Sequence, residues 1–111
     1  MKPIKPSGKV VFSDDSLEQA FNSLPENDEI KKAIRRTIEN LKTNAFCGEA
    51  IRKELIPQEY ISKYKINNLY WYTLPNGWRL VYSLMNNEEV GILAVIIEYF
   101  DHKSYERKFG Y

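Results

Sequence analysis

The segment Leu69–Leu84, with the sequence LYWYTLPNGWRLVYSL, decides the fold that we predict for the rest of the chain. Two runs rich in aromatic and β-branched residues flank Pro75-Asn76-Gly77. Asn-Gly between such runs predicts a β-hairpin, because both residues tolerate the positive φ of a tight turn. Side chains of the second strand alternate between two faces, with Trp78, Leu80, Tyr82 and Leu84 on one and Arg79, Val81 and Ser83 on the other.

Arg79 therefore lies in the middle of a strand, on a half-apolar face. A guanidinium keeps its charge and is costly to bury without a partner. We expect either a carboxylate beside Arg79 or a ligand that Arg79 binds. Glu98, in a later apolar run, is a candidate carboxylate on a neighbouring strand, and such a pair would serve only the fold.

Length and composition predict one globular domain over residues 1–111. A chain of 111 residues can bury roughly 65% of its unfolded surface in one core. Hydrophobic residues make up 43% of the chain and aromatic residues 14%, unlike a disordered sequence. The net charge of +1 gives little support for nucleic-acid binding through overall charge, which leaves a local patch as the remaining route.

The chain has one cysteine, Cys47, and one histidine, His102. This composition excludes an internal disulfide and a four-cysteine zinc site, so we expect no metal and no cofactor. No basic and apolar leader opens the sequence, and the longest apolar run, Ile92–Ile97, is too short to span a bilayer. We therefore expect a soluble cytoplasmic protein without a membrane partner.

The N-terminal half predicts an arm, a strand and two helices. Residues 1–8 form an irregular arm along a neighbouring strand or a partner, and Lys9–Phe12 is a strand. Asp15 and Glu18 resemble a capping box at the start of a helix that ends before Pro25. A second helix starts at residues 27–29 and breaks at residues 46–48. Its basic residues indicate a solvated face, with an acidic ligand as the alternative: Lys31, Lys32, Arg35 and Arg36.

The C-terminal half adds strands and two short helices. Pro57 is the first residue of a short helix, whereas residues 49–56 give no clear signal. The run Ile92–Phe100 is apolar on both faces, as in a central strand. Asp101 caps a last helix that stops at Gly110. We predict an α+β fold with helices on one face of a mainly antiparallel four-stranded sheet.

His102 is the first candidate for chemistry, because imidazole alone among side chains ordinarily titrates near neutral pH. It follows a central strand, where side chains emerge at a sheet edge, although a structural role beside the helix cap stays open. Tyr105 and Phe109 fit packing positions. Cys47 has no basic neighbour in sequence, so a thiolate nucleophile has little support. No phosphate-binding glycine loop or metal motif is present.

Three successive segments carry a resemblance to a known family: the strand Trp78-Arg79-Leu80-Val81-Tyr82 after Gly77, the apolar strand that follows, and the segment 101–107 (DHKSYER). In this order they resemble the RelE/ParE superfamily of type II toxin–antitoxin toxins. The resemblance covers the chain from about Lys9 onward. It implies a RelE/ParE-like fold and a small cytoplasmic toxin held inactive by a cognate antitoxin. RelE-like members cut mRNA on the ribosome without a metal, whereas ParE-like members poison DNA gyrase and are not nucleases.

For a RelE-like member, the resemblance implies three catalytic residues. Arg79 would stabilise charge on the phosphorus centre through a bidentate fork. His102 would act as general base or acid, and Tyr105 as an acid or a base-stacking platform.

The resemblance also implies substrate contacts. Lys103 and Arg107 would hold phosphates. Tyr72, a further candidate, stands with Tyr70 where RelE-like toxins carry lysines, and the overall charge is lower than in ribosome-binding toxins. Either the active centre relies more on His102, or the nuclease chemistry is lost.

We expect a metal-independent endoribonuclease whose partners are a cognate antitoxin, mRNA and the ribosome, with homodimer formation left open. A ParE-like inhibitor of gyrase is one alternative. A degenerate relative that only binds a partner, with Arg79 buried against Glu98, is the other.

Overall fold

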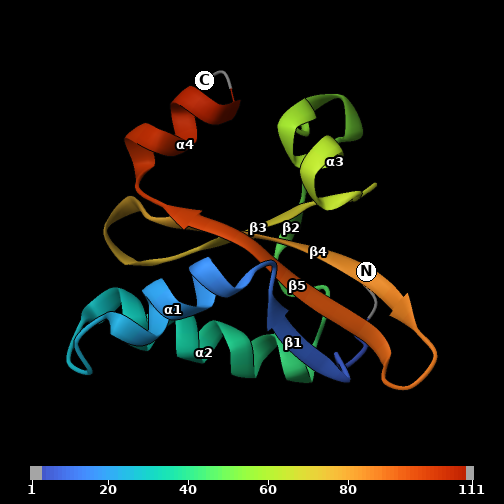
Figure 1. The fold of residues 1–111 in the computed structure, drawn as a ribbon, viewed down its shortest axis with the longest axis horizontal. Helices are drawn as coiled ribbons and strands as arrows, with labels where there is room; N and C mark the ends of the chain where they lie inside the picture. Colours follow the sequence, from blue (N-terminus) through green and yellow to red (C-terminus); the bar gives the residue numbers. More distant parts are fainter. Residues whose placement is uncertain (1–3, 110–111) are drawn as a thin grey trace.

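The computed structural model describes residues 4–109, and Figure 1 shows the strands and helices in their order along the chain. The strands are β1 (Lys9–Phe12), β2 (Glu49–Ala50), β3 (Tyr70–Thr73), β4 (Arg79–Asn87) and β5 (Gly91–Phe100). The α-helices are α1 (Asp15–Ser23), α2 (Glu29–Thr43), α3 (Gln58–Tyr64) and α4 (His102–Phe109). Short 3-10 turns span Lys53–Leu55 and Pro75–Gly77.

The strands of the described residues form one mixed sheet of five, in the order β1-β5-β4-β3-β2. β1 runs parallel to β5, and the other neighbours are antiparallel. The α+β class is confirmed, but the four-stranded sheet is not, because β2 adds a fifth strand. β2 lies in the segment that gave no signal, since two residues are too few to show an alternating pattern.

The β3–β4 hairpin confirms the prediction from the Asn-Gly turn. Asn76 and Gly77 adopt φ values of 59° and 78°, and the Leu74 amide donates to the Trp78 carbonyl across the turn at 2.9 Å. The predicted alternation in β4 also holds, because Leu80 and Tyr82 pack in one buried cluster whereas Val81 packs in another.

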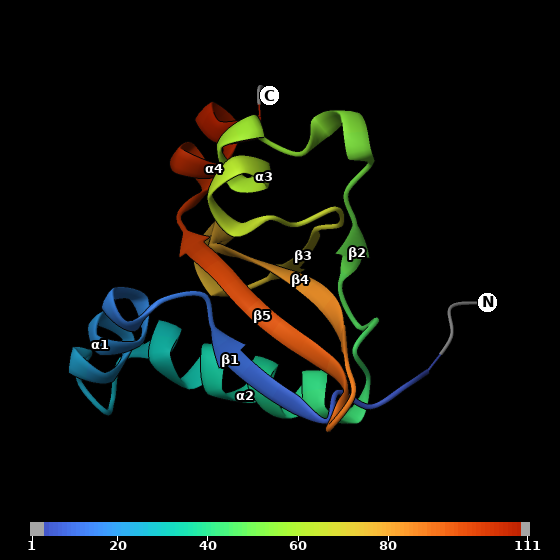
Figure 2. The same ribbon diagram turned by 45° about the vertical axis from the view of Figure 1, so that its right-hand side comes forward.

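Helices cover both faces of the sheet. Figures 1 and 2 show α1 and α2 against one face and α3 and α4 against the other. The prediction of helices on one face is therefore wrong. The physical reason is the sequence of β5, in which Ala94 and Ile96 enter the cluster with α1 and α2 while Val95 and Ile97 enter the opposite one. Both faces are apolar and need cover.

The helix starts follow capping rules, with two corrections. The N-cap of α1 is Asp14 and not Asp15, and its carboxylate accepts from the Leu17 amide at 2.8 Å. Pro57 is the N-cap residue of α3 and not its first helical residue. The predicted cap of α4 is confirmed, because Asp101 accepts from the Ser104 amide at 2.9 Å.

Lys31 contradicts the prediction of a solvated basic face on α2, because it is only 1% exposed. Its ammonium group donates to the carbonyl oxygens of Asn22 and Leu24, at 3.1 and 2.8 Å, and to Glu26 at 2.8 Å. Those carbonyls lie at the end of α1, where the helix leaves acceptors without partners. Lys31 therefore joins α2 to the end of α1.

The N-terminal arm, where it is described, lies against the C-terminal end of α2. The Ser7 amide donates to the Leu41 carbonyl at 3.2 Å, and the Lys5 carbonyl accepts from the Ala45 amide. Residues 1–3 of the predicted arm and the predicted stop at Gly110 lie outside the described residues. Within residues 4–109, no helix has the length and apolar character needed to cross a membrane.

Candidate functional site

Arg79 is the first residue of β4, and not a mid-strand residue as predicted, and it lies on the sheet face that α3 and α4 cover. It lies opposite Thr73 of β3 and Phe100 of β5. The centre of its guanidinium lies 5.0 Å from the centre of the Trp71 ring and 5.5 Å from that of Tyr105. Both distances fall within the range of cation–π contacts. A tryptophan of the sheet and a tyrosine of α4 thus support the half-buried guanidinium.

Toward the described part of the chain, the guanidinium of Arg79 keeps most of its hydrogen-bonding capacity. Among the described residues it donates to the Trp78 carbonyl at 3.4 Å and has no carboxylate within ion-pair distance. A guanidinium carries five N–H donors in a planar fork. The aromatic rings attract the positive charge, but they do not replace an oxygen acceptor for the N–H groups in the guanidinium plane. These N–H groups can therefore still bind an oxyanion.

Glu98 does not pair with Arg79, which corrects that sequence-based alternative. Glu98 stands opposite Val81, two register positions away from the pair of Arg79 and Phe100. Its carboxylate accepts from the Tyr60 hydroxyl and from Lys108, whose ammonium lies 3.2 Å away. Burial first, and then the Glu98 carboxylate, raises the pKa of Tyr60. Glu98 therefore links α3 and α4 to the sheet.

His102 opens α4 beside the hairpin turn. Its imidazole Nε2 lies 2.7 Å from Oε1 of Glu106, one helical turn later, and its side chain is 57% exposed. A side chain added at Gly77 would meet Cβ of His102 at 3.3 Å, so the turn and the start of α4 are in close contact. A hydrogen bond from the Ser104 amide lowers the pKa of Asp101, the residue that caps this helix end.

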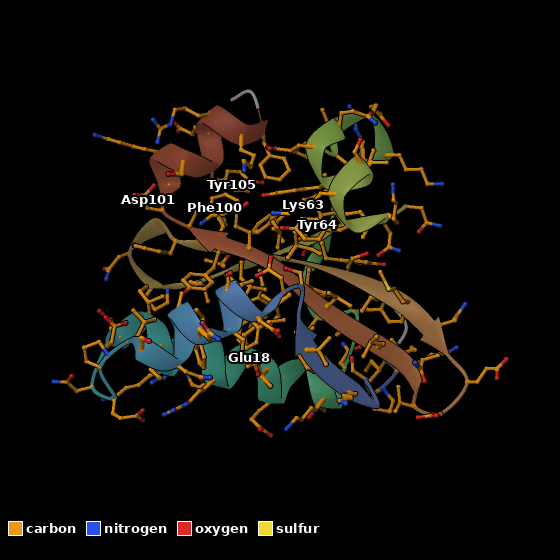
Figure 3. All side chains as sticks on the ribbon, viewed as in Figure 1. Glu18, Lys63, Tyr64, Phe100, Asp101 and Tyr105 are labelled. Carbon is orange, nitrogen blue, oxygen red and sulfur yellow. The ribbon has the colours of Figure 1, made fainter. Side chains whose placement is uncertain are left out.

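Tyr105 lies between α4 and the sheet, next to Phe100 (Figure 3). Its ring stacks on those of Phe100 and Phe109, with centroid distances of 5.8 and 4.7 Å. Tyr105 thus packs α4 against the sheet and contacts Arg79 with the same ring.

Lys103 and Arg107 are exposed residues of α4. They are four residues apart and therefore share one face, and each lies about 160° around the helix from Tyr105, which is two residues away. Arg107 donates to the Ser104 hydroxyl at 3.3 Å and lines a hollow of about 490 Å³ between α3 and α4, together with Glu98. Phe100, which lies opposite Arg79, lines the same hollow as Arg107.

Tyr72 lies on the opposite face of the sheet from Arg79. Its hydroxyl accepts from the Asn40 side-chain amide of α2 at 2.7 Å. It lines a hollow of about 620 Å³ that also includes Arg35 and Arg36. Because neighbouring residues in a strand point to opposite faces, Tyr72 cannot share a site with Trp71 on the Arg79 face.

Two residues of the site, Trp71 and Glu106, have no assigned role in the sequence-based prediction. Trp71 belongs to the same face of the hairpin as Arg79, so the diagonal between antiparallel strands could have revealed this contact. Glu106 follows His102 by four residues, the spacing at which helical side chains meet.

Two features of the candidate site involve α4: the Arg79 cation, supported by the rings of Trp71 and Tyr105, and the His102 imidazole, 2.7 Å from the Glu106 carboxylate. The guanidinium can bind an oxyanion, and the imidazole has the chemistry of a general acid or base. Among residues 4–109, no cluster of three or more His, Cys, Asp or Glu residues is arranged to hold a metal ion. Comparison of the chain with protein-family models, with curated proteins and with solved structures finds no match.

Proposed function

We propose that this chain is a RelE/ParE-like toxin that cleaves mRNA through Arg79 and His102. The observation that carries the proposal is the Arg79 guanidinium, which contacts the Trp71 and Tyr105 rings and has no carboxylate partner among the described residues. A charged group in that setting is suited to an anionic ligand. The ordered sequence resemblance, from the arginine strand to the segment 101–107, supports a phosphodiester of RNA as that ligand.

The proposed reaction is an attack of a ribose 2′-oxygen on the adjacent phosphorus. A bond forms between the 2′-oxygen and phosphorus, and the bond from phosphorus to the 5′-oxygen breaks. The products are a 2′,3′-cyclic phosphate and a free 5′-hydroxyl. His102 accepts the proton of the 2′-hydroxyl, and Tyr105 is the candidate donor of a proton to the leaving 5′-oxygen.

Arg79 acts on the charge that develops during this reaction. The phosphorane oxygens carry more negative charge in the transition state than in the ground state, so a fixed bidentate donor stabilises the transition state more. The Trp71 and Tyr105 rings limit the rotamers that Arg79 can adopt and thereby pre-organise the fork.

The proposed setting is the ribosome in the cytoplasm, with a cognate antitoxin as the inhibitor. The exposed cations Lys103 and Arg107 of α4 are suited to hold phosphates of the RNA or of the ribosome.

Mapping of mRNA 5′-ends in a translating extract tests the proposal. We expect the wild-type protein to cut at a fixed phase within codons, and Arg79→Ala and His102→Ala to leave the mRNA intact. Arg36→Ala is the matched control, because Arg36 is an exposed arginine of α2 on the other face of the sheet. Intact mRNA with the wild-type protein contradicts the proposal, and stalled gyrase complexes in that case would identify the gyrase-inhibitor alternative.

A further inference from the structure

We propose that Glu106 is a positioning residue that fixes which nitrogen of His102 faces the substrate. The proposal rests on the function proposed above and concerns the same site. The geometric basis is the 2.7 Å distance between Nε2 of His102 and Oε1 of Glu106. Both residues belong to α4, and their spacing of four residues brings the side chains together on one helix face.

The Glu106 carboxylate selects one protonation pattern of the neutral imidazole. A carboxylate is an acceptor only, so Nε2 must carry a hydrogen to bind it. In the neutral ring the other nitrogen, Nδ1, is then left with a free lone pair. Nδ1 is therefore the atom that accepts the proton of the 2′-hydroxyl, and the resulting imidazolium charge lies beside the Glu106 carboxylate.

Among the described neighbours of His102, Glu106 is the group that can orient the imidazole ring. On the other side the hairpin turn approaches its Cβ atom at Gly77, which has no side chain. The side-chain amide of Asn76, the residue before Gly77 in that turn, donates to Glu29 at 3.1 Å. Among the described residues, the ion pair of His102 is with Glu106. The turn thus fixes the position of the backbone, and Glu106 fixes the orientation of the ring.

The chain contains one histidine, so its imidazole signals need no assignment. We suggest recording long-range ¹H–¹⁵N correlation spectra of protein that carries ¹⁵N-labelled histidine, at a pH where the imidazole ring is neutral. These spectra give the chemical shifts of the two ring nitrogens. In the wild-type protein we expect the two nitrogen shifts to lie far apart, as in a ring protonated at Nε2. In Glu106→Ala we expect the shifts to move toward each other, because both tautomers are then populated. Unchanged shifts would overturn the proposal.

Two further variants separate the possible contributions of Glu106. Glu106→Gln keeps an acceptor oxygen but loses the charge, so we expect it to retain the separated nitrogen shifts. Glu88→Ala, at an exposed position near the β4–β5 turn, is the control and should match the wild type. Circular dichroism checks that each variant folds, which we expect because Glu106 is 45% exposed.

RNA cleavage supplies the second readout. We expect kcat of Glu106→Ala to fall about tenfold or more with KM unchanged, because general-base catalysis is affected and binding is not. A wild-type kcat in Glu106→Ala would overturn the inference while leaving the proposed function intact. If the wild-type protein cuts no RNA, the proposed function fails, and the nitrogen shifts alone decide whether Glu106 positions His102.

Discussion

The guanidinium of Arg79 lies 5.5 Å from the centre of the Tyr105 ring, so a single contact joins the first residue of β4 to the packed face of α4. The same ring stacks on Phe100 and Phe109. The Arg79 site therefore requires that α4 is docked on the sheet, and Tyr105 serves both the packing and the site.

Substitution of Tyr105 tests this double role. We expect Tyr105→Ala to lower the free energy of unfolding by about 3–5 kcal/mol, because a buried aromatic ring is removed from a stacked cluster. Tyr105→Phe keeps the ring and should lower the free energy of unfolding clearly less than Tyr105→Ala does. Urea denaturation of both variants measures the difference, and equal losses would show that the ring contacts do not hold α4.

Lys31 offers a test of how the two N-terminal helices are joined. Lys31→Met keeps an unbranched side chain but removes the donor for the Asn22 and Leu24 carbonyls and for Glu26. We expect a loss of about 2–4 kcal/mol in the free energy of unfolding. Lys32→Met, at the exposed neighbouring position, should change it by less than about 0.5 kcal/mol. Similar effects of the two substitutions would contradict the role of the buried amine.

Glu26 predicts how stability depends on pH. Hydrogen bonds from Arg35 and then Lys31 lower the pKa of its carboxyl from 4.5 to about 2 in the folded protein. A pKa that is lower in the folded state stabilises the protein above the unfolded pKa, and this contribution is lost as the pH falls from about 4.5 to about 2. We expect Glu26→Gln to be less stable than wild type at pH 7 and equally stable below about pH 2. Thermal melts across this pH range measure the difference, and a constant gap would refute the prediction.

Sequence patterns predicted the hairpin, the two long helices, the central strand and the cap at Asp101, because each depends on residues close together in the chain. Other features depend on tertiary partners. The sequence predicts that Lys31 is exposed, because it does not show that carbonyl acceptors at the end of α1 lie beside it. The two residues of β2 are too few to show a pattern, and only their pairing with β3 identifies them as a strand. The contact between Arg79 and Tyr105 joins two residues that the sequence separates by an entire strand.

Gly77 and Gly91 form a matched pair for testing the contact between the turn and α4. Both have positive φ, 78° and 82°, but an added Cβ meets His102 at Gly77 and no atom within 4 Å at Gly91. Alanine costs about 1–2 kcal/mol of backbone strain at either position. We expect only Gly77→Ala to shift the His102 ring signals as well. Unshifted signals in Gly77→Ala would mean that the turn does not set the position of His102.

The rate of RNA cleavage by Arg79→Lys and Arg79→Ala, with analysis of the product ends, tests the proposed nuclease most directly. We predict 2′,3′-cyclic phosphate and 5′-hydroxyl ends from the wild-type protein and a rate about 10²–10³-fold lower for Arg79→Ala. Arg79→Lys should stay at least about tenfold below wild type, because an ammonium keeps the charge but lacks the planar fork. Cleavage by Arg79→Ala at the wild-type rate, or intact RNA with wild-type protein, would contradict the proposal.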